Sequence, residues 1–197
     1  MTPKWAGFFL VCLALGGCSR SAQDYIAEGN RQFEAGKLQD AELLYRKALQ
    51  KEANSGEAHY RLALAALKQN KGVEAFQLLN RAIELQPDNK EAFARLGEIA
   101  LAVYMADTRR PETMHATLQR ATKRLLELEP EGYDGNRFAG FLALMDAQPT
   151  EAVKLFRKAE KVKPDEPELR LTIAQALIQA GEPEEGEADD HRAIPFS

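Results

Sequence analysis

Few residues of this 197-residue chain are of a type and spacing that supports catalysis or metal binding. Serine occurs only at positions 19, 21, 55 and 197, and none of these lies in a Gly-x-Ser-x-Gly turn. His59, His115 and His191 are far apart, and none has a second His or Cys at the spacing of zinc ligands. The chain also lacks a glycine-rich phosphate loop and a His-Glu-x-x-His pair. We therefore expect no catalytic residue, no metal site and no cofactor, and a protein that is not an enzyme.

The charged side chains are those of a solvated helical protein. The chain carries 26 basic and 30 acidic residues, a formal net charge of -4, which is too weak a field to favour nucleic-acid binding. Glutamates such as Glu74 and Glu151 stand three residues from a lysine, a spacing typical of an exposed helix face. Ala, Leu, Glu, Lys, Arg and Gln are the common residues and aromatic residues make up 8%, so the composition favours helices over strands. The expected fold class is all-α.

Cys18 is the residue whose surroundings suggest a covalent modification. It follows Lys4 and a charge-free run from Trp5 to Gly17. A helix that spans a bilayer needs about 20 apolar residues, so this run is too short to be a stable anchor. A basic start, an apolar middle and small residues at the end are the plan of a secretory signal.

The segment Leu15-Gly16-Gly17-Cys18 resembles the lipobox of bacterial lipoproteins. The resemblance implies that residues 1–17 are a signal peptide, that Cys18 receives a diacylglycerol and becomes the amino terminus, and that residues 18–21 form a short tether. Ser19 is similar to the pattern that sorts such proteins to the outer membrane, facing the periplasm. Two acyl chains anchor a protein stably without spanning the membrane. The alternatives are an ordinary cleaved signal, in which Cys18 is incidental, or a buried first helix.

A repeat of 34 residues fills the rest of the chain. Small residues recur along the chain at nearly constant steps. Twelve residues after most of them lies a second small residue, such as Ala152, and four residues further lies a large one, such as Phe156. Prolines then close units at positions 87, 130 and 164. This register predicts helix pairs that stack and share a core, because one pair cannot bury two apolar faces alone. The recurring small residues are Gly29, Ala63, Gly97, Gly140 and Ala174, at steps of 34, 34, 43 and 34.

These positions resemble the tetratricopeptide repeat, a pair of antiparallel helices. The resemblance implies a right-handed superhelical solenoid over residues 22–182, with units at 22–55, 56–89, 90–132, 133–166 and 167 onward. Glycines such as Gly36 and Gly72 are expected to free the backbone in the turn inside a unit. Asp88 and Asp165 stand where we expect helix N-caps.

Two segments depart from the repeat. Unit three is nine residues longer, which predicts about one extra turn on each helix and a slightly longer loop, with Pro111 opening the second helix. This longer hairpin is either a basic contact tip carrying Arg109 and Arg110 or a harmless elongation. Residues 183–197 are acidic and place Asp190 where other units have a large apolar residue. We expect this last segment to be poorly ordered or truncated.

The first helices of such a solenoid line its concave side, which is where we expect a partner to bind. Aromatic and arginine side chains among charges are typical of protein interfaces. In chaperone-binding members of the family this groove holds a carboxy-terminal carboxylate; Asn30 and Arg95 match that clamp, whereas Ile26 and Arg61 depart from it. Leu64 and Phe141 are equally compatible with the core. The expected groove comprises Asn30, Phe33, Tyr60, Arg61, Leu64, Lys68, Arg95, Glu98, Arg137 and Phe141.

Together the two resemblances imply a membrane-anchored scaffold that mediates protein–protein interaction in the bacterial cell envelope, as an accessory to assembly or export. The expected partners are a protein or peptide in the envelope and the membrane through the lipid, and not nucleic acid. One alternative is the amino-terminal repeat portion of a larger protein whose carboxy-terminal part is enzymatic or sensory. Another is a cytoplasmic chaperone adaptor, against which the segment from Leu15 to Cys18 argues.

Overall fold

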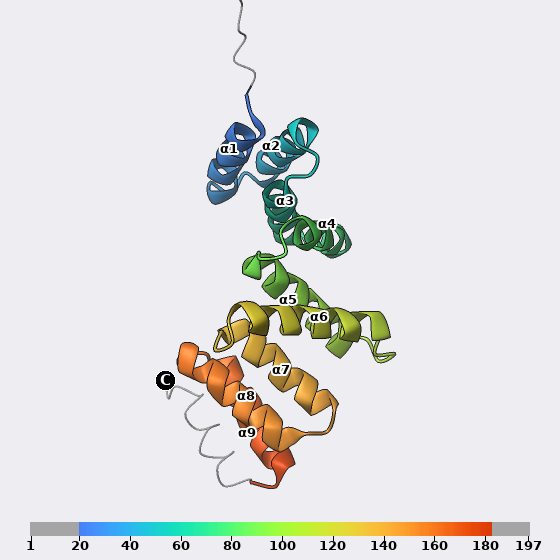
Figure 1. The fold of residues 1–197 in the computed structure, drawn as a ribbon, viewed down its shortest axis with the longest axis vertical. Coiled ribbons are helices and arrows are strands. Elements are labelled where there is room, and N and C mark those ends of the chain that lie inside the picture. Colours follow the sequence, from blue (N-terminus) through green and yellow to red (C-terminus); the bar gives the residue numbers. More distant parts are fainter. Residues whose placement is uncertain (1–19, 183–197) are drawn as a thin grey trace, which may run out of the picture.

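The computed structural model describes residues 20–182, and this part of the chain is helical, with no strand. The helix pairs follow one another along the long axis of the molecule, from the blue pair at one end to the orange helices at the other (Figure 1). The expected all-α solenoid is therefore confirmed. The bounds are α1 Ala22–Glu34, α2 Leu38–Lys51, α3 Gly56–Lys68, α4 Gly72–Leu85, α5 Lys90–Ala106, α6 Glu112–Leu128, α7 Tyr133–Met145, α8 Pro149–Val162 and α9 Pro167–Ala180.

The odd-numbered helices begin at residues 22, 56, 90, 133 and 167, where the units inferred from the repeat begin. Each helix packs on its neighbours in the sequence, and the first helices α5 and α7 also contact each other. The proposed signal peptide, Cys18 and the acidic segment 183–197 lie outside the described residues. Among the helices that are described, none is long and apolar enough to cross a bilayer.

The turn inside a unit has the same backbone geometry in units one, two, four and five. One residue takes a left-handed φ, and the next N–H donates to a carbonyl five residues earlier, as from Lys71 to Ala66 over 2.9 Å. This is the Schellman motif that commonly ends helices. Glycine is the left-handed residue only in units one and five; Asn70 and Ala147 take that place in the others. The expectation for Gly72 was wrong, because Gly72 is the first residue of α4.

Side chains cap only some of the first helices. Ser55 and Asn89 accept hydrogen bonds from backbone N–H groups in the first turns of α3 and α5, which leaves fewer free donors there. The N-cap expected at Asp88 is therefore one residue too early. The cap expected at Asp165 is also wrong, since Glu166 holds the N-cap position of α9 and its side chain makes no capping bond.

Small and large residues fit together where the two helices of a unit cross. A Cβ built on Gly29 would lie 2.5 Å from the Tyr45 ring, and one on Gly140 would lie 2.4 Å from the Phe156 ring. Both rings are completely or almost completely buried. Glycine is thus required at these crossings because the aromatic ring occupies the space of a side chain.

The longer third unit has the expected form. Helices α5 and α6 each contain 17 residues, against 13 and 14 in the other complete units. At the tip, both carboxylate oxygens of Asp107 accept bonds from the Arg109 side chain. Arg110 lies over the Tyr104 ring, with Cζ 5.4 Å from its centroid. Both tip arginines therefore already have partners within the hairpin.

Candidate partner-binding surface

Two adjoining hollows lie along the first helices of units three to five. The first has a volume of about 390 Å³ and is lined mainly by α5, the end of α6 and the start of α7. The second, of about 430 Å³, lies between α5, α7 and the start of α9. Four residues line both hollows, so the two form one continuous concave surface: Glu98, Tyr133, Asp134 and Lys163. We call this surface the concave site.

The start of α7 is fixed tightly enough to position the side chains of the site. The buried Asn136 donates to the carbonyls of Pro130 and Gly132 at 3.0 and 2.8 Å, which ties the first turn of α7 to the preceding loop. Gly135 lets α7 approach α6, since a Cβ there would lie 3.0 Å from a methyl carbon of Leu126. A rigid helix start positions side chains more precisely than a loop does.

Ion pairs organise the charges of the concave site. Arg95 donates to Glu98 at 2.8 Å, and this hydrogen bond raises the pKa of Arg95. Arg137 has Nη2 3.9 Å from an oxygen of Glu98 and 4.0 Å from one of Asp134. Burial raises the pKa of Asp134, and the Arg137 charge opposes that effect. The site therefore contains both signs of charge, with a half-buried carboxylate beside a half-buried guanidinium.

Tyr133 supplies an aromatic surface between two cations. The Nζ atom of Lys163 lies 4.1 Å from the centroid of the Tyr133 ring, and Cζ of Arg137 lies 5.7 Å from it. Arg137 also lies over the Phe138 ring at 4.7 Å. Such contacts hold cationic side chains in place by attraction to the ring face.

The structure brings four of the ten groove residues inferred from the sequence to the concave site: Tyr60, Arg95, Glu98 and Arg137. Tyr60 is only 9% exposed, so it contributes mainly as a wall of the first hollow. The other three carry the charges that a partner would meet.

The remaining six groove residues lie elsewhere. In unit one, Asn30 accepts a hydrogen bond from the Tyr45 hydroxyl at 2.8 Å, and Phe33 packs against a buried cluster. Leu64 packs against the main core, and Phe141 meets Phe156 edge-on at 5.2 Å between ring centroids.

The last two of these residues are charged and lie on α3. Arg61 is paired with Glu57 through a 2.6 Å bond from Nε, so its charge is already engaged within its own helix. Lys68 is exposed at the end of α3. Neither residue lines the concave site.

Sequence reasoning missed Tyr133, Asp134 and Lys163. Tyr133 and Asp134 occupy the first turn of α7, and Lys163 is the C-cap residue that follows α8. The repeat could have indicated them, because the start of the first helix lies beside the end of the second helix of the same unit, as Lys90 does beside Glu129 in unit three and Tyr133 beside Lys163 in unit four. The prediction instead favoured residues near the small position in the middle of these helices.

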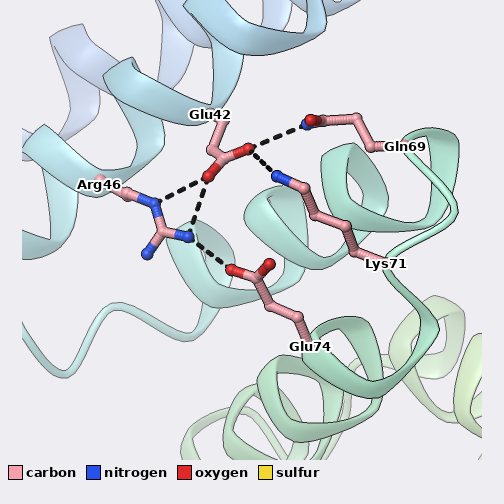
Figure 2. A network of polar contacts seen from close by, with 5 residues as sticks. All are labelled: Glu42, Arg46, Gln69, Lys71 and Glu74. Carbon is pink, nitrogen blue, oxygen red and sulfur yellow. Dashed lines mark hydrogen bonds and ion pairs between the residues drawn. The ribbon is translucent and has the colours of Figure 1, made fainter.

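A second polar cluster ties unit one to unit two. Figure 2 shows Glu42 of α2 with Arg46 on one side and with Gln69 and Lys71 on the other; the side chains of Gln69 and Lys71 donate to it at 3.0 and 2.8 Å. Arg46 bridges Glu42 and Glu74 of α4. These bonds lower the pKa of Glu42 from 4.5 to about 2, with the Lys71 bond as the largest cause. The donors and acceptors satisfy one another, so this network is a structural tie between units.

The fold and its surface define a helical-repeat binding scaffold. Two models of the tetratricopeptide repeat match the chain, over residues 26–90 and 143–188. The chain belongs to the tetratricopeptide-repeat family. Proteins with this repeat are in general non-catalytic and bind other proteins.

Several known proteins are similar to this chain. MamA from Desulfovibrio magneticus RS-1, residues 41 to the end, superposes with a TM-score of 0.73 at 14% identity, covering 89% of this chain and 94% of that one. TTC0263, a thermophilic TPR protein of Thermus thermophilus, gives 0.62 at 20% identity, covering 88% and 90%. At these identities the likeness shows the fold alone.

A curated relative is much longer than this chain. Human Protein O-mannosyl-transferase TMTC3 is 31% identical over 154 residues, which are 73% of this chain. The chain spans only 15% of the length of that relative. The match therefore concerns a small part of the human protein.

Proposed function

We propose that this protein is a lipid-anchored scaffold of the bacterial cell envelope, facing the periplasm with a solenoid that binds a protein partner at the concave site. The repeat family supports the binding role, since stacked helix pairs create extended concave surfaces that these proteins use. The segment Leu15 to Cys18 supports the lipid anchor, and Ser19 supports the location in the outer membrane. The proposed role is that of an accessory to assembly or export, without catalysis.

The observation that carries the choice of surface is the continuity of the two hollows across Glu98, Tyr133, Asp134 and Lys163. Together their linings include residues of four successive units, from Tyr60 in unit two to Glu168 in unit five, as an extended partner segment requires. They combine an aromatic ring with charges of both signs, and aromatic and arginine side chains often dominate binding energy at interfaces.

Capture of the partner protein from solubilised envelopes, with the lipidated protein as the bait, tests this proposal. The full lipidated protein, purified from detergent-solubilised membranes, carries either Arg95→Glu with Lys163→Glu, or a control pair, Arg81→Glu with Lys154→Glu. All four side chains are exposed, and the control positions lie on the second helices α4 and α8. We expect the concave pair to lose at least about tenfold of the captured partner, because two hydrogen-bond donors of the site are replaced by carboxylates that only accept, and the control to keep it.

Equal capture by both variants would move the partner to another surface and refute the assignment of the concave site. Circular dichroism of each variant verifies that the helices remain folded. Tyr60→Ala is unsuitable for this experiment, because Tyr60 belongs to the buried core.

A second candidate function is that the repeats form one portion of a larger polypeptide with an enzymatic or sensory part. The size of the human relative favours it, since there the matching repeats are a small share of a protein named as a transferase. The flanking reading frame distinguishes the candidates, because a larger protein requires coding sequence in frame beyond residue 197.

A further inference from the structure

Arg137 is a half-buried arginine whose side chain makes no hydrogen bond to the rest of the described chain. Its side chain is 20% exposed, and its buried Nε has no acceptor among residues 20–182. The oxygens of Glu98 and Asp134 nearest to Nη2 are 3.9 and 4.0 Å away, beyond hydrogen-bond distance. Other half-buried arginines are satisfied, as Arg124 is by the Pro87 carbonyl at 2.8 Å.

Packing rather than hydrogen bonding holds Arg137 in place. Its guanidinium lies over the Phe138 ring at 4.7 Å, and Phe138 is completely buried. Leaving the donors of a desolvated guanidinium without acceptors costs free energy. Arg137 lines the second hollow. Its terminal N–H groups are therefore donors to which an acceptor that enters this hollow can bind.

Asp134 is the matching acceptor, and its carboxylate receives no hydrogen bond from residues 20–182. Its carboxylate is half-buried on the same hollow, one turn before Arg137, and its ion pair at 4.0 Å is too long for a hydrogen bond. Burial raises its pKa, which reflects the cost of removing the charge from water. A ligand that donates to Asp134 and accepts from Arg137 would relieve both groups at once.

The charges of the hollow select the chemistry of that ligand. Four carboxylates line it, against the two cations Arg137 and Lys163. A ligand carboxylate would add to this negative excess, and a ligand ammonium would leave the Arg137 donors unmet. A primary carboxamide is neutral and offers a carbonyl acceptor and N–H donors on the same carbon atom. The four carboxylates are those of Glu98, Asp134, Glu166 and Glu168.

We propose that the hollow between α5, α7 and the start of α9 binds an asparagine or glutamine side chain of the partner segment. The carboxamide oxygen accepts from the Arg137 guanidinium, and the carboxamide nitrogen donates to the Asp134 carboxylate. The ring of Tyr133 forms one wall of the same hollow. This inference rests on the proposed function, and it names the residue type in the partner that the concave site selects.

Selection from a degenerate octapeptide library tests the inference. The immobilised full-length protein is the bait, and the retained peptides are sequenced. We expect Asn and Gln to be enriched at least about threefold over the input at one position, which corresponds to roughly 0.65 kcal/mol of preference. Asp134→Ala removes the acceptor and a buried charge, so it should fold and lose the enrichment.

A second variant and a control separate recognition from folding. Arg137→Lys keeps the charge but lacks the planar fork of donors, so the Asn and Gln preference should fall by more than half. The control is Asp146→Ala with Arg81→Met, which alters one exposed residue of each charge outside the hollow and should leave the enrichment unchanged.

The outcomes of this selection distinguish a failure of the inference from a failure of the proposed function. Enrichment of Asp and Glu, of Lys and Arg, or of no side chain among retained peptides would overturn the inference and leave the binding role standing. Enrichment of Asn and Gln that survives both Asp134→Ala and Arg137→Lys would overturn the assigned residues. Retention of no peptide above the blank matrix would contradict both the inference and the concave binding site.

Discussion

The crossing of α7 and α8 allows a sharp test of the packing. Adding one methyl group at Gly140 would place its Cβ 2.4, 2.6 and 2.8 Å from three carbons of the Phe156 ring. Real Cβ atoms essentially never lie that close to a neighbour. The ring cannot swing outward, because Phe156 is completely buried and meets Phe141 edge-on. Gly140→Ala must therefore displace the helices or the ring.

The expected change in the free energy of unfolding of Gly140→Ala follows from two opposing effects. Overpacking a core typically costs about 1–3 kcal/mol. Alanine in a helix interior regains about 0.5–1 kcal/mol relative to glycine. Because three ring carbons clash at once, we expect the upper part of the first range and a net loss of about 1–2 kcal/mol in the free energy of unfolding.

Denaturant unfolding followed by circular dichroism measures this loss, and Gly72→Ala is the matched control. Gly72 lies in the first turn of α4 and a Cβ there would meet nothing within 4 Å, so alanine should stabilise the protein by about 0.4–1 kcal/mol. In unit two the equivalent crossing pairs Ala63 with Leu79. Phe156→Leu should therefore rescue Gly140→Ala, with a coupling energy of about 1 kcal/mol or more. Strict additivity of the two changes would refute the packing argument.

Two further predictions concern acid stability and the amino end. The pKa of Glu42 is lowered from 4.5 to about 2, so its stabilising bonds are present above pH 4.5 and are lost as the pH falls toward 2; the stability difference between the parent and Glu42→Gln, measured by denaturant titration, should shrink over that window. A difference that stays constant would contradict the network. Cys18→Ser should shift the protein from the membrane fraction to a soluble or uncleaved form, and the mature parent should lack tryptophan emission because Trp5 is the single tryptophan. A mature mass that includes residues 1–17 or lacks acyl chains would refute lipidation.

The repeat made the helical fold predictable, while the details of turns and caps depended on local geometry. Steps of 34 residues between small positions can be counted in the sequence, and a helix pair of that length has few ways to stack. The identity of the left-handed residue in each turn could not be predicted in this way, because the Schellman hydrogen bonds outweigh the preference for glycine at Asn70 and Ala147. The expectation that a glycine occupies the turn therefore assigned Gly72 to it, although Gly72 is the first residue of α4.

The candidate site was only partly predictable, for a geometric reason. Helical spacing identifies which residues share a face, so Arg95, Glu98 and Arg137 could be assigned to the first helices. Spacing does not reveal which part of that face is hollow. The hollows also depend on Lys163, which caps the end of the second helix of its unit and reaches the Tyr133 ring from there.

The main departure from the repeat helps to build the concave site. Thr122 stands where other units carry a large apolar residue, and it is buried with its hydroxyl donating to the Leu118 carbonyl at 2.7 Å. The ring that lies against Gly97 instead comes from Phe138 of the next unit, 2.4 Å from the position of a Cβ on that glycine. Phe138 thus joins units three and four, and Arg137 lies over its ring. Thr122 is thus too small to pack against Gly97, and Phe138 of the next unit packs there in its place. The same Phe138 ring contacts the guanidinium of Arg137 in the concave site.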